Sequence, residues 1–252
     1  MTDERYSFEE SEVPYETLSK FGLTHEMIED LPSDILDEIF LGHKTPLLPI
    51  KAKTDDGIEI QDYTRFSLVR KANGEVDVLF YPRLDEIDLN RYSAEEKSKL
   101  KSNHAIIGDY TFRNGRTTKA FIQLDPETSQ VLAVPTPVIG RNLQLIADEL
   151  DLDSSDLVKL QDGKVLTKRR DNSSVSLGID LNFPHGIRFA TGDETQWNRE
   201  NKREWDRFNF GIYGCWTQDN EGNLQYIYEE DYTQELWDAQ QENIQKAYNI
   251  KR

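Results

Sequence analysis

Three short segments of the 252-residue chain repeat one pattern of apolar and polar positions. In each, an apolar residue is followed three places later by Gly or Asn, and then by a basic or imidazole side chain. A helix often ends with a residue in the left-handed region, where Gly costs no strain and Asn costs little. The pattern therefore predicts three short helices that end just before Gly42, Asn103 and Gly163.

Each predicted helix is followed by alternating apolar and polar residues and by a turn. The turns fall at Asn73-Gly74, Thr128-Ser129 and His185-Gly186. Asn-Gly between two alternating runs is a strong signal for a hairpin, and alternation is typical of half-buried strands. We therefore predict an α+β fold made of repeated short-helix plus antiparallel β-hairpin units.

The spacing of these features favours an internal repeat. The cap positions lie 61 and 60 residues apart, and the turns lie 55 and 57 apart. The first copy is longer, and its excess falls in the polar stretch 53–57, which has the composition of a surface loop. Repeated units would bury their apolar faces on one another. The alternative is that an apolar residue before a Gly-capped turn is common in any α+β protein.

Composition divides the chain into four segments. Residues 1–15 are polar and acidic without periodicity, which predicts a disordered tail. Residues 16–44 predict an acidic helical segment in which Thr24 caps a helix. Residues 45–192 hold the repeated units, and residues 193–252 predict an aromatic-rich helix–hairpin–helix subdomain.

A Pro-rich stretch, 135–142, predicts a stiff loop that leads into an amphipathic helix over 143–150 with Asn142 as its N-cap. One interpretation makes this loop a binding edge, with Arg141 as an anion contact. The other makes it a rigid turn between the second and third units.

All the tryptophans fall in the last sixty residues. A charged helix is predicted over 197–208, a hairpin across 218–223 and a final helix from Thr233. Dense aromatic residues form the core of a small subdomain, or they stack on bases or grip a peptide. We expect the core role, and an exposed tryptophan would favour binding. The candidate interaction residues are Arg141, Trp197, Trp205, Trp216 and Trp237.

The net charge of −17 is concentrated at the two ends of the chain. Residues 1–44 carry −9 and residues 193–252 carry −6, whereas residues 45–192 carry only −2. Long-range attraction to nucleic acid is therefore disfavoured. Local basic groups in the centre would form a positive strip if the repeated units align: Lys97, Lys99, Lys101, Arg113, Arg116, Lys119, Lys164, Lys168, Arg169 and Arg170.

The sequence carries no motif of a known reaction. A phosphate-binding Gly-rich loop, a nucleophile elbow, a zinc-protease helix and paired CxxC motifs are all missing. The stretch 151–162 begins like a calcium loop but lacks the Gly and Glu that such a loop needs. We therefore expect no catalytic, cofactor-binding or metal-binding residues.

A single cysteine, Cys215, allows no intramolecular disulfide, and we expect it to be a buried structural thiol. The sequence shows no signal peptide and no apolar run of transmembrane length. These features predict a cytoplasmic protein without a membrane segment.

Three stretches resemble known families: GHKTPLLPI at 42–50, KAFIQLDPET at 119–128 and YGCWT at 213–217. They are similar to uncharacterised domain-of-unknown-function families on conjugative and other mobile elements of gut bacteria. Such domains are often associated with type IA topoisomerase or mobilisation proteins. The resemblance covers most of residues 20–240. It implies a setting in DNA transfer and its host conflicts, and it assigns no activity or catalytic residue.

Two hypotheses for function follow. The first is a non-catalytic adaptor that binds another protein of a mobile-element or phage-conflict system, with DNA-processing machinery as a candidate partner. The second is an acidic DNA mimic that inhibits a DNA-binding enzyme. A weaker alternative is an accessory protein that binds nucleic acid through the central basic groups.

Overall fold

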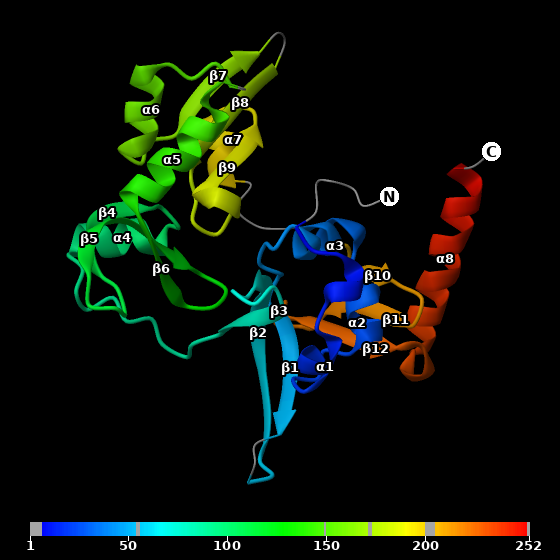
Figure 1. Cartoon of the computed structure of the whole chain (residues 1–252). Helices are drawn as coiled ribbons and strands as arrows, with labels where there is room; N and C mark the ends of the chain where they lie inside the picture. Colours follow the sequence, from blue (N-terminus) through cyan, green and yellow to red (C-terminus); the bar gives the residue numbers. More distant parts are fainter. Residues whose placement is uncertain (1–6, 54–55, 149, 171–172, 200–204, 251–252) are drawn as a thin grey trace. The chain divides into compact units, whose positions relative to one another are not determined.

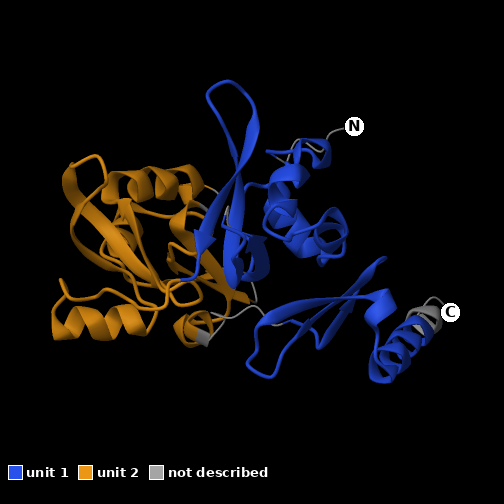
Figure 2. Ribbon diagram, turned by 90° about the horizontal axis from the view of Figure 1, so that it is seen from below, with its two compact units in different colours: residues 1–83, 204–252 blue, residues 84–203 orange. Residues whose placement is uncertain are grey.

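The computed structural model describes residues 7–53, 56–148, 150–170, 173–199 and 205–250. Within these ranges the chain forms eight α-helices and four three-stranded antiparallel sheets (Figure 1). The predicted α+β class with hairpin units is therefore confirmed. The chain divides into two compact units (Figure 2): unit 1 is Met1–Arg83 with Glu204–Arg252, and unit 2 is Leu84–Arg203.

Unit 1 combines the two ends of the chain. Its sheets have the strand orders β1-β2-β3 and β10-β11-β12. Its 3₁₀ and α-helices are η1 (Glu10–Glu12), α1 (Tyr15–Ser19), α2 (His25–Glu29), α3 (Ser33–Phe40), η3 (Glu229–Asp231) and α8 (Gln234–Ile250). Its strands are β1 (Leu48–Lys53), β2 (Glu59–Arg70), β3 (Val76–Pro82), β10 (Phe208–Phe210), β11 (Gly214–Gln218) and β12 (Leu224–Tyr228).

Unit 2 holds the middle of the chain, with sheets β4-β5-β6 and β7-β8-β9. Its helices are α4 (Ala94–Lys101), α5 (Thr136–Ala147), α6 (Ser154–Gln161), η2 (Pro184–Gly186) and α7 (Glu194–Arg199). Its strands are β4 (Ile106–Thr111), β5 (Thr117–Asp125), β6 (Gln130–Pro135), β7 (Leu166–Arg170), β8 (Ser173–Ile179) and β9 (Ile187–Thr191).

The three predicted helix ends share one geometry. Gly42, Asn103 and Gly163 have φ of 79°, 59° and 77°, in the left-handed region. In each case the next residue's N–H donates to the carbonyl five residues earlier, as in a Schellman motif. The apolar residue three places before the cap is fully buried each time: Ile39, Leu100 and Leu160. Burying such a side chain contributes about 1.5–3 kcal/mol, so each helix end is anchored by its own cap sequence.

The three predicted hairpin turns are also present. Gly74, Ser129 and His185 all adopt positive φ, at 89°, 57° and 57°. Each turn joins the second and third strands of a sheet, so each predicted hairpin gains a first strand, namely β1, β4 or β7. The extra length of the first copy relative to the second is shared by the longer β2, with twelve residues against nine in β5, and by the connection 43–47, which is longer than 104–105. The connections 54–58 and 112–116 are equally long, so the excess does not lie in the predicted loop at 53–57.

The core of unit 1 joins segments that are far apart in the sequence. Helices α1–α3, strand β2 and strands β11 and β12 contribute to one hydrophobic cluster. Trp216 on β11 is fully buried there, and its indole N–H donates to the carbonyl of Met27 at 2.9 Å. The structure divides the predicted segment 193–252 between the two units. Its helix α7 lies in unit 2, whereas the strands after α7 share a core with the helices of segment 16–44.

The N-terminal segment differs from the predicted disordered tail. Residues 1–6 lie outside the described residues, but Phe8 and Val13 are buried in the core of unit 1. Arg70 also donates hydrogen bonds to both carboxylate oxygens of Glu12. The apolar residues are isolated in sequence, so periodicity gives no sign of their burial.

Two predicted boundaries are wrong. The stretch 135–142 is not a loop: Pro135 ends strand β6, and α5 begins at Thr136, because Pro fits the first turn of a helix. The predicted N-cap, Asn142, therefore lies inside the helix. Of the helix predicted over 197–208, residues 197–199 belong to α7, residues 200–204 lie outside the described residues, and Phe208 begins strand β10.

Strand β5 explains how unit 2 is packed. Phe121 belongs to a core formed with α5, α6 and strands β7–β9. Its neighbours Ala120 and Ile122 belong to a second core, formed with α4 and β4. Because adjacent side chains point to opposite faces of a strand, both faces of this sheet are covered.

Candidate functional site

The structure places the predicted interaction residues in different surroundings. Arg141 is exposed on α5. Trp197 and Trp216 are buried, in units 2 and 1 respectively, and Trp205 is half-buried. Trp237, in the first turn of α8, is the most exposed tryptophan at 37%. Trp237 is therefore the tryptophan best placed to contact a partner.

Trp237 is one end of an aromatic row in unit 1. We use this name for Phe208, Phe210, Tyr232 and Trp237, whose successive ring centroids lie 6.0, 5.9 and 5.2 Å apart. The two phenylalanines are two positions apart on β10 and so point to the same face. Tyr232 lies in the connection from β12 to α8, and Trp237 lies in the first turn of α8. Offset and edge contacts of this kind hold aromatic rings in place.

The row adjoins an exposed turn between β10 and β11, which we call the 212–213 turn. Its side chains, Ile212 and Tyr213, are 79% and 42% exposed. Its backbone is held rigidly, because the Asp30 carboxylate accepts hydrogen bonds from the N–H groups of Ile212 at 2.6 Å and Tyr213 at 2.9 Å. Tyr226 donates its hydroxyl to the same carboxylate. The turn therefore presents two large side chains from a fixed backbone.

Glycines on both sides of the turn permit this arrangement. A Cβ on Gly211 would lie 2.0 Å from the Asp30 Cγ, and one on Gly214 would lie 2.4 Å from the Ile227 carbonyl oxygen. No side chain fits at either position without displacing its neighbours. The spacing Gly-Ile-Tyr-Gly is the sequence signal that could have pointed to this turn.

Acidic groups surround the exposed side chains. The charge of Glu29 is the main reason that the pKa of Tyr213 is raised, and Glu26 and Asp30 add to it. Burial, with Glu229 among the nearby charges, raises the pKa of Tyr232. Both phenols therefore stay neutral at physiological pH.

The acidity belongs to one unit. Unit 1 carries 28 acidic and 13 basic residues, a net charge of −15, whereas unit 2 carries 19 and 17, a net charge of −2. The two acidic ends of the chain are thus part of the same compact body. Arg207 pairs with Glu235 beside the aromatic row and lies 4.8 Å above the Phe208 ring.

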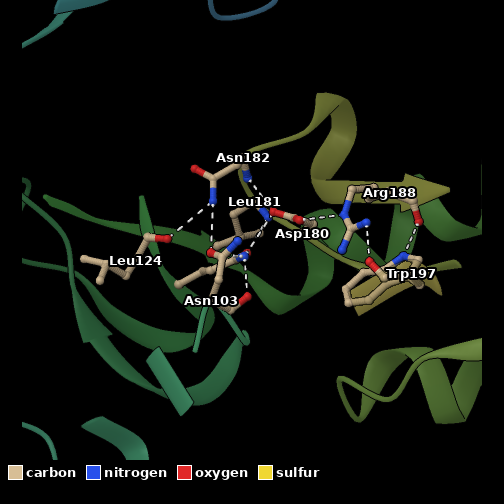
Figure 3. Close-up of polar contacts among 8 residues, drawn as sticks. Asn103, Leu124, Asp180, Leu181, Asn182, Arg188 and Trp197 are labelled. Atoms are coloured by element: carbon tan, nitrogen blue, oxygen red, sulfur yellow. Dashed lines mark hydrogen bonds and ion pairs between the residues drawn. The ribbon is translucent and has the colours of Figure 1, made fainter. Parts of the chain in front are cut away.

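Unit 2 contains a buried polar network that sequence patterns did not reveal (Figure 3). The Arg188 guanidinium donates to Asp180 at 2.9 Å and to the Trp197 carbonyl at 2.7 Å. It also lies 3.7 Å from the centroid of the Trp197 ring. Both charged residues are about 1% exposed. The hydrogen bonds between Arg188 and Trp197 run in both directions and hold α7 against β9.

The same network joins two sheets of unit 2. The Gln123 amide on β5 donates to Asp180 and to the carbonyl of the helix cap Asn103, each at 3.0 Å. Its oxygen accepts from the N–H of Leu181 at 2.6 Å. The network is enclosed and joins β5, the segment after β8, and β9, but among the described residues its Arg188 Nη2 and Asn182 Oδ1 atoms have no hydrogen-bond partner.

Cysteine and histidine are residue types common in catalysis, and the structure shows the surroundings of Cys215 and His43. Cys215 is buried, and burial raises the pKa of its thiol to about 11, so the reactive thiolate is scarce at neutral pH. His43 contacts Glu38 at 2.9 Å beside its helix cap. One group of side chains in the described part of unit 1 could hold a metal ion, namely Glu10, His25 and Glu29.

The described helices are too short or too polar to cross a lipid bilayer. Residues 8–92 match the model of a family described as "Protein of unknown function (DUF4099)". The match covers about a third of the chain: α1–α3, the first sheet and the start of unit 2. No curated protein and no solved structure matches the chain. The first third therefore resembles an uncharacterised domain family, and that family carries no assigned activity.

Proposed function

We propose that this chain is a non-catalytic interaction protein whose unit 1 binds a basic segment of another protein. The contact would be made by the 212–213 turn and the adjoining aromatic row. The observation that carries the proposal is the exposure of Ile212 and Tyr213 from a backbone that Asp30 holds in place.

A large apolar side chain exposed to water is less favourable in free energy than a buried one, and a bound partner would bury it. A buried isoleucine contributes about 1.5–3 kcal/mol relative to an exposed one, so Ile212 gains most when a partner covers it. Tyrosine and tryptophan are enriched among residues that dominate binding energy. Because the turn is already ordered, little conformational entropy is lost on association.

Charge defines the chemistry of the partner. The turn and the row belong to the unit of net charge −15, and Glu26, Glu29 and Glu229 lie near their phenols. A Lys- or Arg-rich segment is attracted to such a surface, and its cations stack favourably on aromatic rings. The repeated helix-and-sheet units would serve as the scaffold that presents this surface.

The biological setting of the proposal is a mobile element or a phage-conflict system, with DNA-processing machinery as the partner. This part rests on the sequence resemblance alone. Proteins that process DNA carry basic surfaces, which agrees with the proposed partner chemistry.

Peptide binding tests the proposal directly. Labelled Lys/Arg-rich peptides are titrated with the full chain, next to the same peptides with Gln at each basic position. We expect tighter binding of the basic set, and a loss of about tenfold or more in the Ile212→Ser/Tyr213→Ser variant. Leu145→Ser is the matched control, because Leu145 is 73% exposed on α5 in unit 2. Equal binding of both peptide sets, or an unchanged affinity in the turn variant, would overturn the proposal.

A second candidate is the acidic DNA mimic, favoured by the gathering of both acidic ends in unit 1. A mimic would compete with duplex DNA for a DNA-binding enzyme, and the competition would survive the Ile212→Ser/Tyr213→Ser change. Competition that disappears in this variant supports the aromatic contact instead. Direct binding of the chain to DNA, weakening steeply with salt, would favour the accessory role of the central basic groups.

A further inference from the structure

Three side chains of unit 1 converge at the surface of α2. The ligand atoms of Glu10, His25 and Glu29 all lie within 4.8 Å of one another. Glu10 comes from η1, and the other two are the first and last residues of α2. Glu10 and His25 are fifteen positions apart, so the grouping cannot be read from sequence spacing.

Helix α2 aligns two of the three. His25 and Glu29 are four residues apart and therefore share one face, with the ring Nδ1 3.4 Å from a Glu29 oxygen. Thr24 fixes the start of the helix at His25, because its hydroxyl accepts a hydrogen bond from the N–H of Met27. Met27 and Ile28 are buried in the core, which leaves the His25 face outward.

Glu10 is positioned by contacts that its neighbours in and around η1 make with the rest of unit 1. Phe8 and Val13, on either side of η1, are buried in the core. Glu12 accepts hydrogen bonds from Arg70. These contacts hold η1 against the unit, and the Glu10 carboxylate is placed beside α2 as a result.

The surroundings favour a bound cation. The Tyr15 ring packs edge-on against His25, with centroids 4.1 Å apart, and so restricts the imidazole. Burial and the charges of Glu10 and Glu29 raise the pKa of Tyr15 to about 12, so the phenol stays neutral. Two carboxylates thus meet one imidazole within a unit of net charge −15.

We propose that Glu10, His25 and Glu29 bind one divalent transition-metal ion of the Zn²⁺ type. An imidazole with two carboxylates suits Zn²⁺ or Ni²⁺, whereas Ca²⁺ and Mg²⁺ take oxygen ligands. Metal–ligand distances of about 2.0–2.2 Å require the three groups to draw closer, which the exposed Glu10 side chain permits. Three protein ligands leave a coordination position for water or for a side chain of a partner.

The bound ion would link η1 to α2. Because the ligands come from two elements, binding favours the folded unit and raises its apparent stability by mass action. Protons compete with the metal for its ligands, so affinity falls as the solution is made more acidic.

Calorimetric titration of the purified, metal-free full chain with Zn²⁺ tests the site. We expect one site per chain, no comparable binding of Ca²⁺, and a loss of about tenfold or more in affinity for His25→Ala and for Glu10→Gln. His104→Ala is the control, since His104 is exposed in unit 2. Circular dichroism of each variant without metal separates loss of a ligand from loss of folding.

Three results would overturn the proposal: Zn²⁺ affinity unchanged in His25→Ala, an equal loss in His104→Ala, or equal binding of Ca²⁺. Glu29 also lies near Tyr213, so the metal site and the 212–213 turn must be separated by experiment. Peptide titrations run in the presence of a chelator report on the 212–213 turn alone.

Discussion

The carboxylate of Asp30, at the end of α2, accepts a hydrogen bond from the backbone N–H of Ile212 at 2.6 Å, across 182 residues of sequence. This contact joins the N-terminal helices to the C-terminal sheet. It also gives the exposed 212–213 turn its fixed shape. Stability of unit 1 and presentation of its candidate binding surface therefore depend on the same side chain.

Replacing Asp30 by Ala should destabilise unit 1 by about 3 kcal/mol. The change removes the acceptor of three part-buried hydrogen bonds, from the N–H groups of Ile212 and Tyr213 and from the hydroxyl of Tyr226, and hydrogen bonds to a charged group contribute about 1.5–3 kcal/mol when buried and less when partly exposed. Urea unfolding gives the free energy. The exposed Asp231 provides the control, and Asp231→Ala should change stability by less than about 0.5 kcal/mol. Equal effects of the two changes would show that Asp30 does not hold the turn.

The two Gly caps should respond differently to alanine. Both adopt positive φ, which costs a residue with a Cβ about 1–2 kcal/mol. At Gly163 the nearest atoms to the added Cβ lie 3.9 Å away, so strain is the whole cost. At Gly42 the Cβ would lie 2.8 Å from the Phe8 ring, so repacking adds about 1–3 kcal/mol.

Denaturant unfolding of Gly42→Ala and Gly163→Ala measures the difference. A larger loss for Gly42→Ala supports the packing of Phe8 under the first cap. If Gly163→Ala lowered the free energy of unfolding as much as Gly42→Ala, Phe8 would not pack against Gly42 as described.

Removing the charge of Arg188 should strongly destabilise unit 2. Arg188→Met leaves Asp180 buried without its partner, which costs about 3–5 kcal/mol. The double change Arg188→Met/Asp180→Ala should cost less than the sum of the two single changes, because the residues are directly coupled. Arg141→Met, on the exposed face of α5, is the matched control. Additive effects in the double-mutant cycle would contradict the ion pair.

The Glu12–Arg70 pair should give unit 1 a pH-dependent contribution. Hydrogen bonds from Arg70 lower the pKa of Glu12 from 4.5 to about 2. A lowered pKa in the folded state means that the stabilisation is present above pH 4.5 and is lost as pH falls toward 2.

The measurement compares urea midpoints of the native sequence and Glu12→Gln at pH 6 and pH 3. The gap between them should narrow at the lower pH. Glu16→Gln, which changes the same charge at an exposed i,i+4 pair, serves as the control. A gap that stays constant would mean that the pair does not form in solution.

Part of the candidate site could be predicted from the sequence. Trp237 is one of the predicted interaction residues, and it is exposed, as a binding role requires. Trp216 is also one of them, but it is buried. Ile212 and Tyr213 were missed, since an exposed turn residue differs from a buried one only through contacts that lie elsewhere in the chain. The glycines at 211 and 214 were the available signal. Glycine is required at these two positions because Asp30 and Ile227 lie against them in the folded chain, and the sequence does not show that contact.

The sequence by itself determined the local elements of this protein. The caps at Gly42, Asn103 and Gly163 and the turns at Gly74, Ser129 and His185 depend on the backbone conformation of a few neighbouring residues, so local composition specifies them. It also determined the α+β class, because alternation and helix caps recur in order along the chain.

Only the tertiary structure decided which elements belong together. The two ends of the chain share the core around Trp216, and Glu10 meets His25 and Glu29, through contacts that carry no periodic trace in the sequence. The start of α5 also needed the fold, because a Pro-rich stretch is compatible with a stiff loop and with the first turn of a helix. Burial is a property of the whole assembly of elements, and residues far apart along the chain supply it.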